Sequence, residues 1–159
     1  NTVGSRSKII LAYIAGFLDG DGSLMFQLKK RKDGNKSRSR FMLTICFYQD
    51  TRHEKTLFWI QRVLQSGYIS KRKDGITELR INGFKRVKII LEKLKPFIRF
   101  KSKQVRMLLA VSRLLQKSNL RRQDFLRLAD YMIAIQKENY VTKKKKTREE
   151  LLKILGLTP

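Results

Sequence analysis

The sequence predicts an α+β fold of order αββαββα, in which a helix and two antiparallel strands occur twice and C-terminal helices follow. Apolar residues recur every three or four positions near the start of the chain, alternate over two pairs of short segments, and return to helical spacing after residue 84. A hydrophobic share of 42% in 159 residues is enough for one packed core. We expect one domain over residues 1–142 and a basic extension with a short helix over residues 143–159.

Residues 7–19 have the spacing of an amphipathic helix. Its apolar face is formed by Ile10, Tyr13, Ile14 and Phe17. Another stripe of the same helix carries only small residues, Ala12, Gly16 and Gly20. Because small residues let two backbones approach closely, this stripe indicates either tight packing within the chain or a helix contact across a dimer axis. Spacing alone leaves both possibilities open.

Alternating apolar and polar residues predict two β-hairpins. The first lies within residues 24–48 and turns at Asp33-Gly34-Asn35, and the second lies within residues 68–81 and turns at Asp74-Gly75. The tetrapeptide Arg-Lys-Asp-Gly occurs at the tip of both hairpins, which favours a repeated helix–hairpin unit. The four strands are expected to form one antiparallel sheet.

Helical spacing predicts the remaining elements. One helix follows Asp50 or Thr51, either of which is a suitable N-cap. Others are expected over residues 84–95, 102–116 and 121–137, and Pro96 ends the first of these. Thr147 and Glu150 form a capping box before a last short helix.

The charge of the chain indicates its class of partner. The sequence has 37 lysines and arginines against 13 aspartates and glutamates, a net charge of +24. Because such an excess resists compaction until an anion neutralises it, nucleic acid is the expected partner. No membrane partner is expected, since no apolar run could span a bilayer and the positive charge is spread along the chain. One cysteine excludes an internal disulfide, and it also excludes a zinc site with several cysteines.

The string Asp19-Gly20-Asp21-Gly22 joins the first helix to the first strand. Two carboxylates flanked by glycines suit either a metal site or an ordinary tight turn. The carboxyl end of a helix carries partial negative charge and favours a nearby cation. If two such helices pack along their small stripes, two copies of one acid meet at the axis.

Residues 14–22, IAGFLDGDG, resemble the LAGLIDADG motif of homing endonucleases. The matching positions are Ala15, Gly16, Asp19, Asp21 and Gly22. The other changes exchange one apolar residue for another, or Gly for Ala. A single copy of the motif resembles the homodimeric branch of the family, which is typified by enzymes encoded in organellar ribosomal RNA introns. The predicted element order agrees with that branch.

The resemblance implies a dimer interface and a metal site. In the family the motif helix pairs with its own copy, which here points to Ala12, Ala15, Gly16 and Asp19 as interface residues. The last acid of the motif, Asp21, would hold Mg²⁺ with help from the Gly20 carbonyl, and Mn²⁺ or Ca²⁺ would substitute in binding. Asp19 ranks below Asp21, because the first acid more often supports the end of the helix.

The resemblance also implies a catalytic set around Asp21. Gln49 occupies the position of a family glutamine at the end of the second strand. Lys101 occupies that of a family lysine after the proline-terminated helix. His53 stands where the family has a basic residue, and its neighbour Arg52 is an alternative. These groups would order water and phosphate around the metal rather than attack directly.

The polar side of the two hairpins is the expected DNA interface, although a solvated sheet face would have the same alternation. Arg, Gln, Glu and Thr side chains are suited to reading base edges, and a β-ribbon fits the major groove. The candidate DNA-contacting residues are Met25, Gln27, Lys29, Arg31, Arg38, Arg40, Thr44, Cys46, Tyr48, Tyr68, Ser70, Arg72, Glu78 and Arg80.

The resemblance therefore implies a Mg²⁺-dependent homodimeric homing endonuclease that leaves 3′ overhangs. Two symmetric sheets would cover a pseudo-palindromic target of about twenty base pairs. A maturase acting on intron RNA, a non-cleaving DNA-binding regulator and a ribosomal protein are the alternatives, and the retained Asp21, Gln49 and Lys101 argue against them. An organellar intron would place the enzyme in the chloroplast or mitochondrion, and otherwise the cytoplasm or nucleoid is expected.

Overall fold

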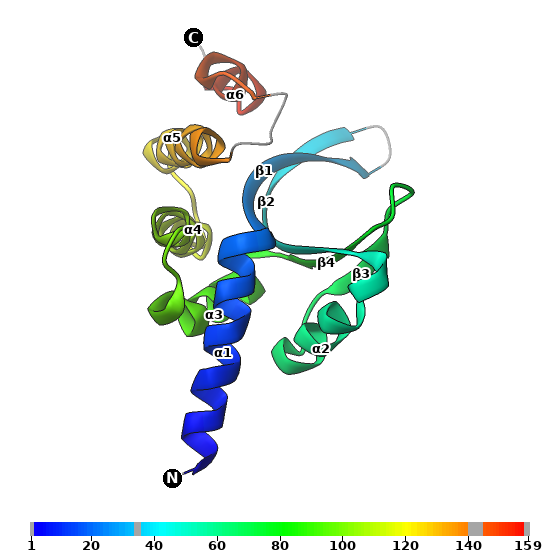
Figure 1. Ribbon diagram of the computed structural model, residues 1–159. Helices are drawn as coiled ribbons and strands as arrows, with labels where there is room; N and C mark the ends of the chain where they lie inside the picture. Colours follow the sequence, from blue (N-terminus) through cyan, green and yellow to red (C-terminus); the bar gives the residue numbers. More distant parts are fainter. Residues whose placement is uncertain (1, 34–35, 140–144, 158–159) are drawn as a thin grey trace.

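The computed structural model describes the backbone of residues 2–33, 36–139 and 145–157, and the side chains of residues 6–30, 39–139 and 145–157. It confirms the α+β architecture (Figure 1). The elements in chain order are α1 (Thr2–Asp21), β1 (Gly22–Asp33), β2 (Lys36–Asp50), the 3-10 turn η1 (Thr51–His53), α2 (Lys55–Leu64), β3 (Tyr68–Lys71), β4 (Ile76–Asn82), α3 (Phe84–Leu94), the 3-10 turn η2 (Lys95–Phe97), α4 (Ser102–Leu115), α5 (Arg122–Glu138) and α6 (Arg148–Ile154).

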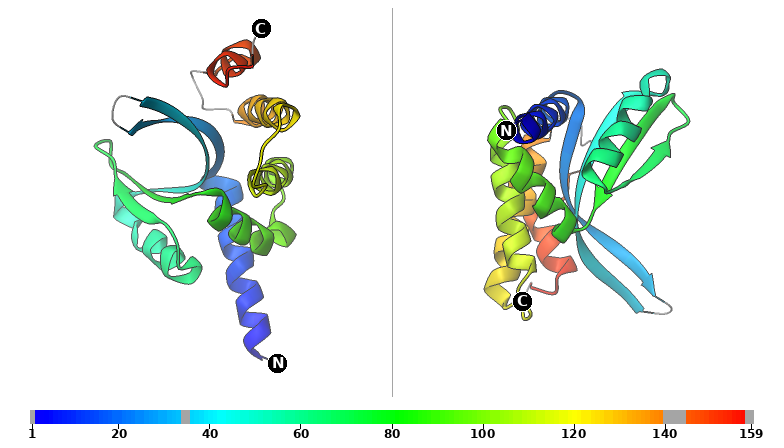
Figure 2. Two further views of the ribbon diagram at one scale, coloured as in Figure 1. Left: turned by 180° about the vertical axis from the view of Figure 1, so that it is seen from behind. Right: turned by 90° about the horizontal axis from the view of Figure 1, so that it is seen from below.

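The four strands form one antiparallel sheet in the order β1-β2-β4-β3. The strands are strongly curved, and α1, α2 and α3 lie on the convex side of the sheet (Figure 1). Figure 2 shows the two hairpins diverging toward their tips. The predicted Asp74-Gly75 turn is present, and Gly75 has a φ of +80°, which glycine adopts without strain. The turn predicted at Asp33-Gly34-Asn35 includes residues 34–35, which lie outside the described residues.

The hydrophobic core lies between the convex face of the sheet and the helices. Leu24, Leu43, Ile45, Phe47 and Leu79 alternate along three strands and are fully buried. α1 and α3 contact β2, α2 and α3 contact β4, and α5 contacts β1. The concave face of the sheet carries the polar members of the same alternation. The described helices do not cover this face (Figure 1).

α1 is longer than the apolar spacing predicts. It begins at Thr2 rather than Ser7 and ends at Asp21 rather than Asp19. The spacing detects only the part of the helix that packs on the core, where Ile14, Ala15 and Leu18 are fully buried. The added last turn brings the backbone of Gly20 and Asp21 to the carboxyl end of the helix, immediately before β1.

The start of α2 also differs from the prediction. Asp50 accepts a hydrogen bond from the Arg52 amide at 2.9 Å, but it caps η1 and not α2. α2 begins at Lys55 without a side-chain cap. The intervening turn is held to the second hairpin, since the Thr51 hydroxyl donates to the carbonyl of Gly75, just before β4, at 2.9 Å.

The C-terminal segment packs on the main body of the protein. The predicted capping box is present, because Thr147 accepts from the Glu150 amide at 3.2 Å and Glu150 accepts from the Thr147 amide at 3.2 Å. α6 contacts α5, and Leu151 is fully buried in the common core. The expected boundary at residues 142–143 lies outside the described residues. Within the described residues no helix is long and apolar enough to cross a membrane.

Candidate active site and nucleic-acid interface

The carboxyl end of α1 brings together the acids of the motif and Lys101. Asp21 and Gly20 are exposed, whereas Asp19 is only 8% exposed. The Lys101 ammonium donates to the main-chain oxygen of Asp19 at 2.6 Å. The two acids therefore have different surroundings: Asp19 faces the protein and Asp21 faces outward.

Burial lowers the pKa of Lys101, and the nearby carboxylates of Asp19 and Asp21 oppose this shift. The main-chain oxygens of a final helical turn lack partners within the helix and carry partial negative charge. Lys101 satisfies one of these oxygens with a charged hydrogen bond. The ammonium thus lies beside the backbone that leads to Gly20 and Asp21.

The donor set at Asp21 fits a hard divalent cation. An exposed carboxylate and carbonyl oxygens are the ligands that Mg²⁺ and Ca²⁺ prefer. Within the described part of the chain, no three His, Cys, Asp or Glu side chains lie together as a metal site. A cation at Asp21 would therefore have no cluster of three such side chains in the described part of one subunit, and further oxygen ligands would have to come from elsewhere.

A pocket of about 660 Å³ adjoins this end of α1. Its walls include the catalytic candidate Lys101, and they also include Tyr48, Gln104 and Asn139, which the sequence did not single out for catalysis. Asn139 donates to the Leu24 carbonyl at 3.0 Å and so ties the end of α5 to β1. No motif in the sequence marks Gln104 or Asn139, because only the packing of α4 and α5 brings them to this place.

The structure places Gln49 at the same end of the sheet. Gly22 pairs with Phe47, so Gln49 extends two residues past that pair toward the end of α1. Its side-chain oxygen accepts from the Asp50 amide at 2.9 Å. His53 lies exposed in η1, and its neighbour Arg52 is paired with Asp50 at 3.0 Å, which holds the pKa of that carboxyl at about 2.

The concave face of the sheet carries the predicted nucleic-acid interface in cross-strand rows. Register pairs Met25 with Thr44, Gln27 with Met42 and Lys29 with Arg40. On the other hairpin, Tyr68 pairs with Arg80 and Ser70 pairs with Glu78. The side chains of Arg31 and Arg38 lie outside the described residues. The exposed members include Lys29, Arg40, Tyr68 and Arg72.

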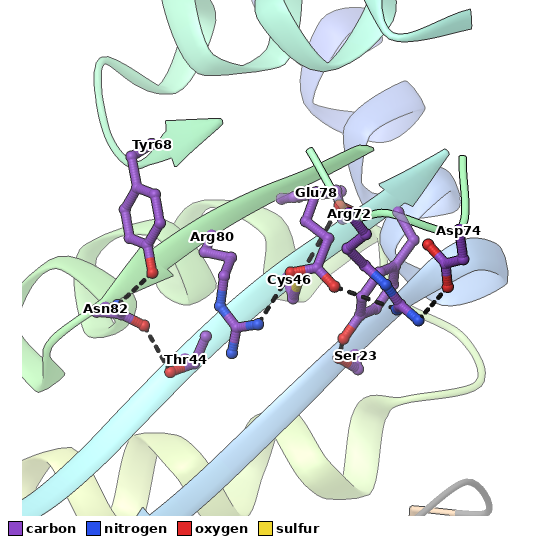
Figure 3. Close-up of polar contacts among 11 residues, drawn as sticks. Ser23, Thr44, Cys46, Tyr68, Arg72, Asp74, Glu78, Arg80 and Asn82 are labelled. Atoms are coloured by element: carbon purple, nitrogen blue, oxygen red, sulfur yellow. Dashed lines mark hydrogen bonds and ion pairs between the residues drawn. The ribbon is translucent and has the colours of Figure 1, made fainter. Parts of the chain in front are cut away.

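Three predicted DNA-contacting side chains are instead covered. The exposed fractions of the whole residues are 2% for Thr44, 0% for Cys46 and 6% for Glu78. Thr44 donates to Asn82 at 2.7 Å, and the Cys46 sulfur lies beneath the charged side chains of β4 (Figure 3). Burial raises the pKa of the Cys46 thiol to about 11. Alternation gave the correct face for these residues but could not show that longer neighbours cover them.

Glu78 organises two arginines on this face. Arg80 donates to one carboxylate oxygen at 2.9 Å, and Arg72 donates to the other at 3.3 Å (Figure 3). Asp74 also accepts from Arg72 at the tip of the hairpin. Two guanidinium groups are therefore held in fixed positions on the concave side.

Ser23 and Asn82 belong to the same face, although the sequence did not single them out. Ser23 and Tyr48 are hydrogen bonded at 2.9 Å, and burial raises the pKa of Tyr48 to about 12. Asn82 bridges Thr44 and the Tyr68 hydroxyl (Figure 3). The alternation of β1 and β4 carries the signal for both, since Ser23 is two residues before Met25 and Asn82 is two residues after Arg80.

One face of α1 remains exposed in the isolated subunit. Ile9 is 66% exposed and Tyr13 is 55% exposed, and both Gly16 and Gly20 are exposed on the same side of the helix. Tyr13 packs edge-on against Trp59 of α2, with 5.6 Å between ring centroids. This surface is continuous from α1 onto α2.

Two of the predicted interface residues do not belong to this exposed face. Ala15 is fully buried and Asp19 is 8% exposed, so both side chains face the interior of their own subunit. The motif letters alone do not distinguish the two sides of the helix. Gly16 and the partly exposed Ala12 remain as candidates.

One exposed acid at the end of α1, beside a curved sheet with basic side chains on its concave face, is the arrangement expected of an enzyme that acts on nucleic acid. The chain belongs to the LAGLIDADG endonuclease family, whose sequence profile matches residues 14–114. The resemblance found in residues 14–22 is thereby confirmed.

Its relatives include two algal enzymes. DNA endonuclease I-CvuI from Chlorella vulgaris is 33% identical over 107 residues, which span 67% of this chain and 65% of that enzyme. DNA endonuclease I-CreI from Chlamydomonas reinhardtii is 27% identical over 149 residues, which span 94% of this chain and 90% of that enzyme. A crystal structure of I-CvuI with its target and calcium superimposes with a TM-score of 0.82 at 25% identity, covering 97% of this chain and 99% of that one.

Proposed function

We propose that this protein is a homodimeric homing endonuclease that cuts both strands of a specific DNA target with the help of Mg²⁺. The observation that carries the proposal is the exposed Asp21 at the end of α1, with the Lys101 ammonium bound to the same helix end. Family membership and the names of the algal relatives support DNA as the substrate.

The concave face supplies the DNA-binding surface of the proposal. Lys29 and Arg40 lie directly opposite each other on β1 and β2 and are both exposed. Like charges in this position destabilise a sheet. A phosphate backbone removes that cost, because it places negative charge between them. The exposed or partly exposed side chains proposed for base or phosphate contact are Met25, Gln27, Lys29, Arg40, Tyr48, Tyr68, Ser70, Arg72 and Arg80, and we retain Arg31 and Arg38 from the sequence.

The dimer forms through α1 in this proposal. Gly16 lies on the exposed face with Ile9 and Tyr13, and a β-carbon built on it meets no atom of the described chain within 4 Å. A second copy of α1 can therefore approach the backbone at this position. Pairing of the helices brings two Asp21 carboxylates to one axis, which supplies the acid that one subunit lacks.

Asp21 and the Gly20 carbonyl hold the divalent cation, with Ca²⁺ or Mn²⁺ substituting in DNA binding. When bound, the cation supplies an activated water and charge stabilisation at the phosphate. Lys101 offers a fixed positive charge to the phosphate from the same helix end. Gln49, with His53 or Arg52, orients solvent from the end of β2.

The test uses a DNA substrate in which the two sequences that flank the encoding gene are joined directly to each other, so that the gene itself is absent. The proposal predicts one double-strand cut near the junction in Mg²⁺, with short 3′ overhangs. The resemblance of the single motif to the homodimeric branch of the family implies an organellar intron as the source, and hence the chloroplast or mitochondrion as the compartment. Binding of the spliced or unspliced intron RNA without any DNA cut would contradict the proposal and favour a maturase.

A further inference from the structure

The carboxylate of Asp19 bridges two segments that are 80 residues apart in the chain. One oxygen accepts from the Arg99 amide at 2.6 Å, and the other accepts from the Lys101 amide at 3.0 Å. The side chain is 8% exposed, so these bonds are shielded from water. Ionised acceptors form stronger hydrogen bonds than neutral ones, so this carboxylate fixes the backbone between η2 and α4.

The main chain of Asp19 binds the other end of the same lysine. The Lys101 ammonium donates to the Asp19 carbonyl oxygen at 2.6 Å. One residue of α1 therefore holds both the backbone and the ammonium of Lys101. A lysine side chain has several rotatable bonds, and anchoring both ends restricts the positions that it can take relative to Asp21.

We infer that Asp19 is a positioning residue, which sets Lys101 against the carboxyl end of α1 for phosphodiester cleavage. The inference rests on the proposed endonuclease function and adds a division of labour between the two acids. Asp21 remains exposed for the cation and DNA, while Asp19 directs its oxygens inward at main-chain amides. The first acid of the motif thus acts on the reaction only through Lys101.

The bridging bonds are tested first without metal or DNA. Amide hydrogen exchange, followed residue by residue, is measured in the wild-type protein and in Asp19→Ala. The Arg99 and Lys101 amides are expected to be protected in the wild type and to exchange much faster in the variant, while core amides of β2 keep their protection. Equal exchange at Lys101 in the two proteins would overturn the inference.

The effect on the reaction is tested with a double-mutant cycle. Single-turnover cleavage of the joined flanking DNA is measured for the wild type, Asp19→Ala, Lys101→Met and the double variant, at saturating protein. Misplacement of a reacting group by about 1 Å can cost about 100-fold in rate, so Asp19→Ala is expected to slow cutting by about that factor. In the Lys101→Met background the same change should cost no more than about twofold. A cost of equal size in both backgrounds would show that Asp19 only supports folding.

Two further variants separate positioning from stability. Asp19→Asn keeps one acceptor oxygen and should recover part of the rate lost in Asp19→Ala. Asp124 is the matched control, because it is 6% exposed and accepts from a backbone amide and a lysine, Arg121 at 3.0 Å and Lys117 at 2.9 Å. Asp124→Ala should lower stability without slowing the cut. A wild-type chain that cuts nothing overturns the proposed function, whereas equal cutting by the wild type and Asp19→Ala overturns the positioning role alone.

Discussion

Arg80 donates to the carboxylate of Glu78 at 2.9 Å on the concave face of the sheet. The Glu78 side chain is 8% exposed and that of Arg80 is 26% exposed, so the ion pair is largely shielded from water. Arg72 binds the other oxygen of the same carboxylate. This buried carboxylate therefore holds two arginine side chains in place on the concave face.

Replacing Glu78 with Gln should reduce discrimination between DNA sequences. The change leaves Arg80 without a charged acceptor and leaves Arg72 with Asp74 alone, and breaking a shielded charge pair costs about 3 kcal/mol. Selection of preferred sites from a randomised DNA library should give a broader set for Glu78→Gln than for the wild type. Glu92→Gln is the control, because Glu92 is half exposed and its ion pair with Lys88 is long, at 4.0 Å. An unchanged site preference in Glu78→Gln would mean that the arginines do not need this carboxylate.

The Cys46 thiol should be unreactive in the folded protein. It is fully buried, and burial raises its pKa to about 11, so almost no thiolate is present near neutral pH. A colorimetric thiol reagent at pH 8 should label the sequence's one cysteine only when denaturant is added. Glu78→Gln should speed the labelling, because the side chains that cover the sulfur are released. Fast labelling of the native wild type would contradict the described covering of β2.

A charged side chain at Gly16 should prevent dimerisation while leaving the subunit folded. Position 16 has open space around it, and replacing a helical glycine removes a cost of about 0.5–1 kcal/mol. Analytical ultracentrifugation should find a dimer for the wild type and a monomer for Gly16→Glu, which should also lose double-strand cutting. Gln123→Glu introduces the same charge on exposed α5 and should remain dimeric. A Gly16→Glu dimer that cuts at the normal rate would refute the α1 interface.

Binding to DNA should weaken steeply as salt rises. Each phosphate neutralised by a protein cation contributes about 0.9 to the slope of log affinity against log salt. DNA affinity measured by fluorescence anisotropy in Ca²⁺ should show a large negative slope for the wild type. Lys29→Gln should make this slope shallower by about 0.9, the contribution of one phosphate contact. Lys93→Gln, at an exposed position of α3, should leave the slope unchanged. A slope near zero would place the net charge of +24 outside the DNA interface.

Local patterns in the sequence predict the helices and strands better than they predict which side chains are exposed to solvent. Alternation located the four strands and the concave face, because inward and outward residues repeat every second position. The same alternation assigned Cys46 and Glu78 to DNA contact, although the structure covers them with Arg72 and Arg80. Cys46 of β2 lies beneath charged side chains of β4, and Glu78 is paired with Arg80 of its own strand and with Arg72 of the hairpin turn. The alternation within one strand does not predict such covering.

The motif predicts the position of the site but not the roles within it. Asp19 and Asp21 are two residues apart, yet one is buried and bonded to residues 99 and 101 while the other is exposed. The length of α1 decides this difference, since its last turn extends to Asp21 instead of stopping at Asp19. Asn139 could not be predicted, because only the packing of α5 on β1 brings it near.

Substitution of Asp21 by Asn tests the central claim most directly. The side chain is exposed, so the change should alter stability by less than about 0.5 kcal/mol. Asp130→Asn removes an exposed acid from α5 and serves as the control for lost negative charge. The joined flanking DNA is incubated with each protein, with binding measured in Ca²⁺ and cutting measured in Mg²⁺. We expect Asp21→Asn to bind as the wild type does and to give no double-strand product, and cutting by this variant at the wild-type rate would contradict the assignment of Asp21 as the catalytic metal ligand.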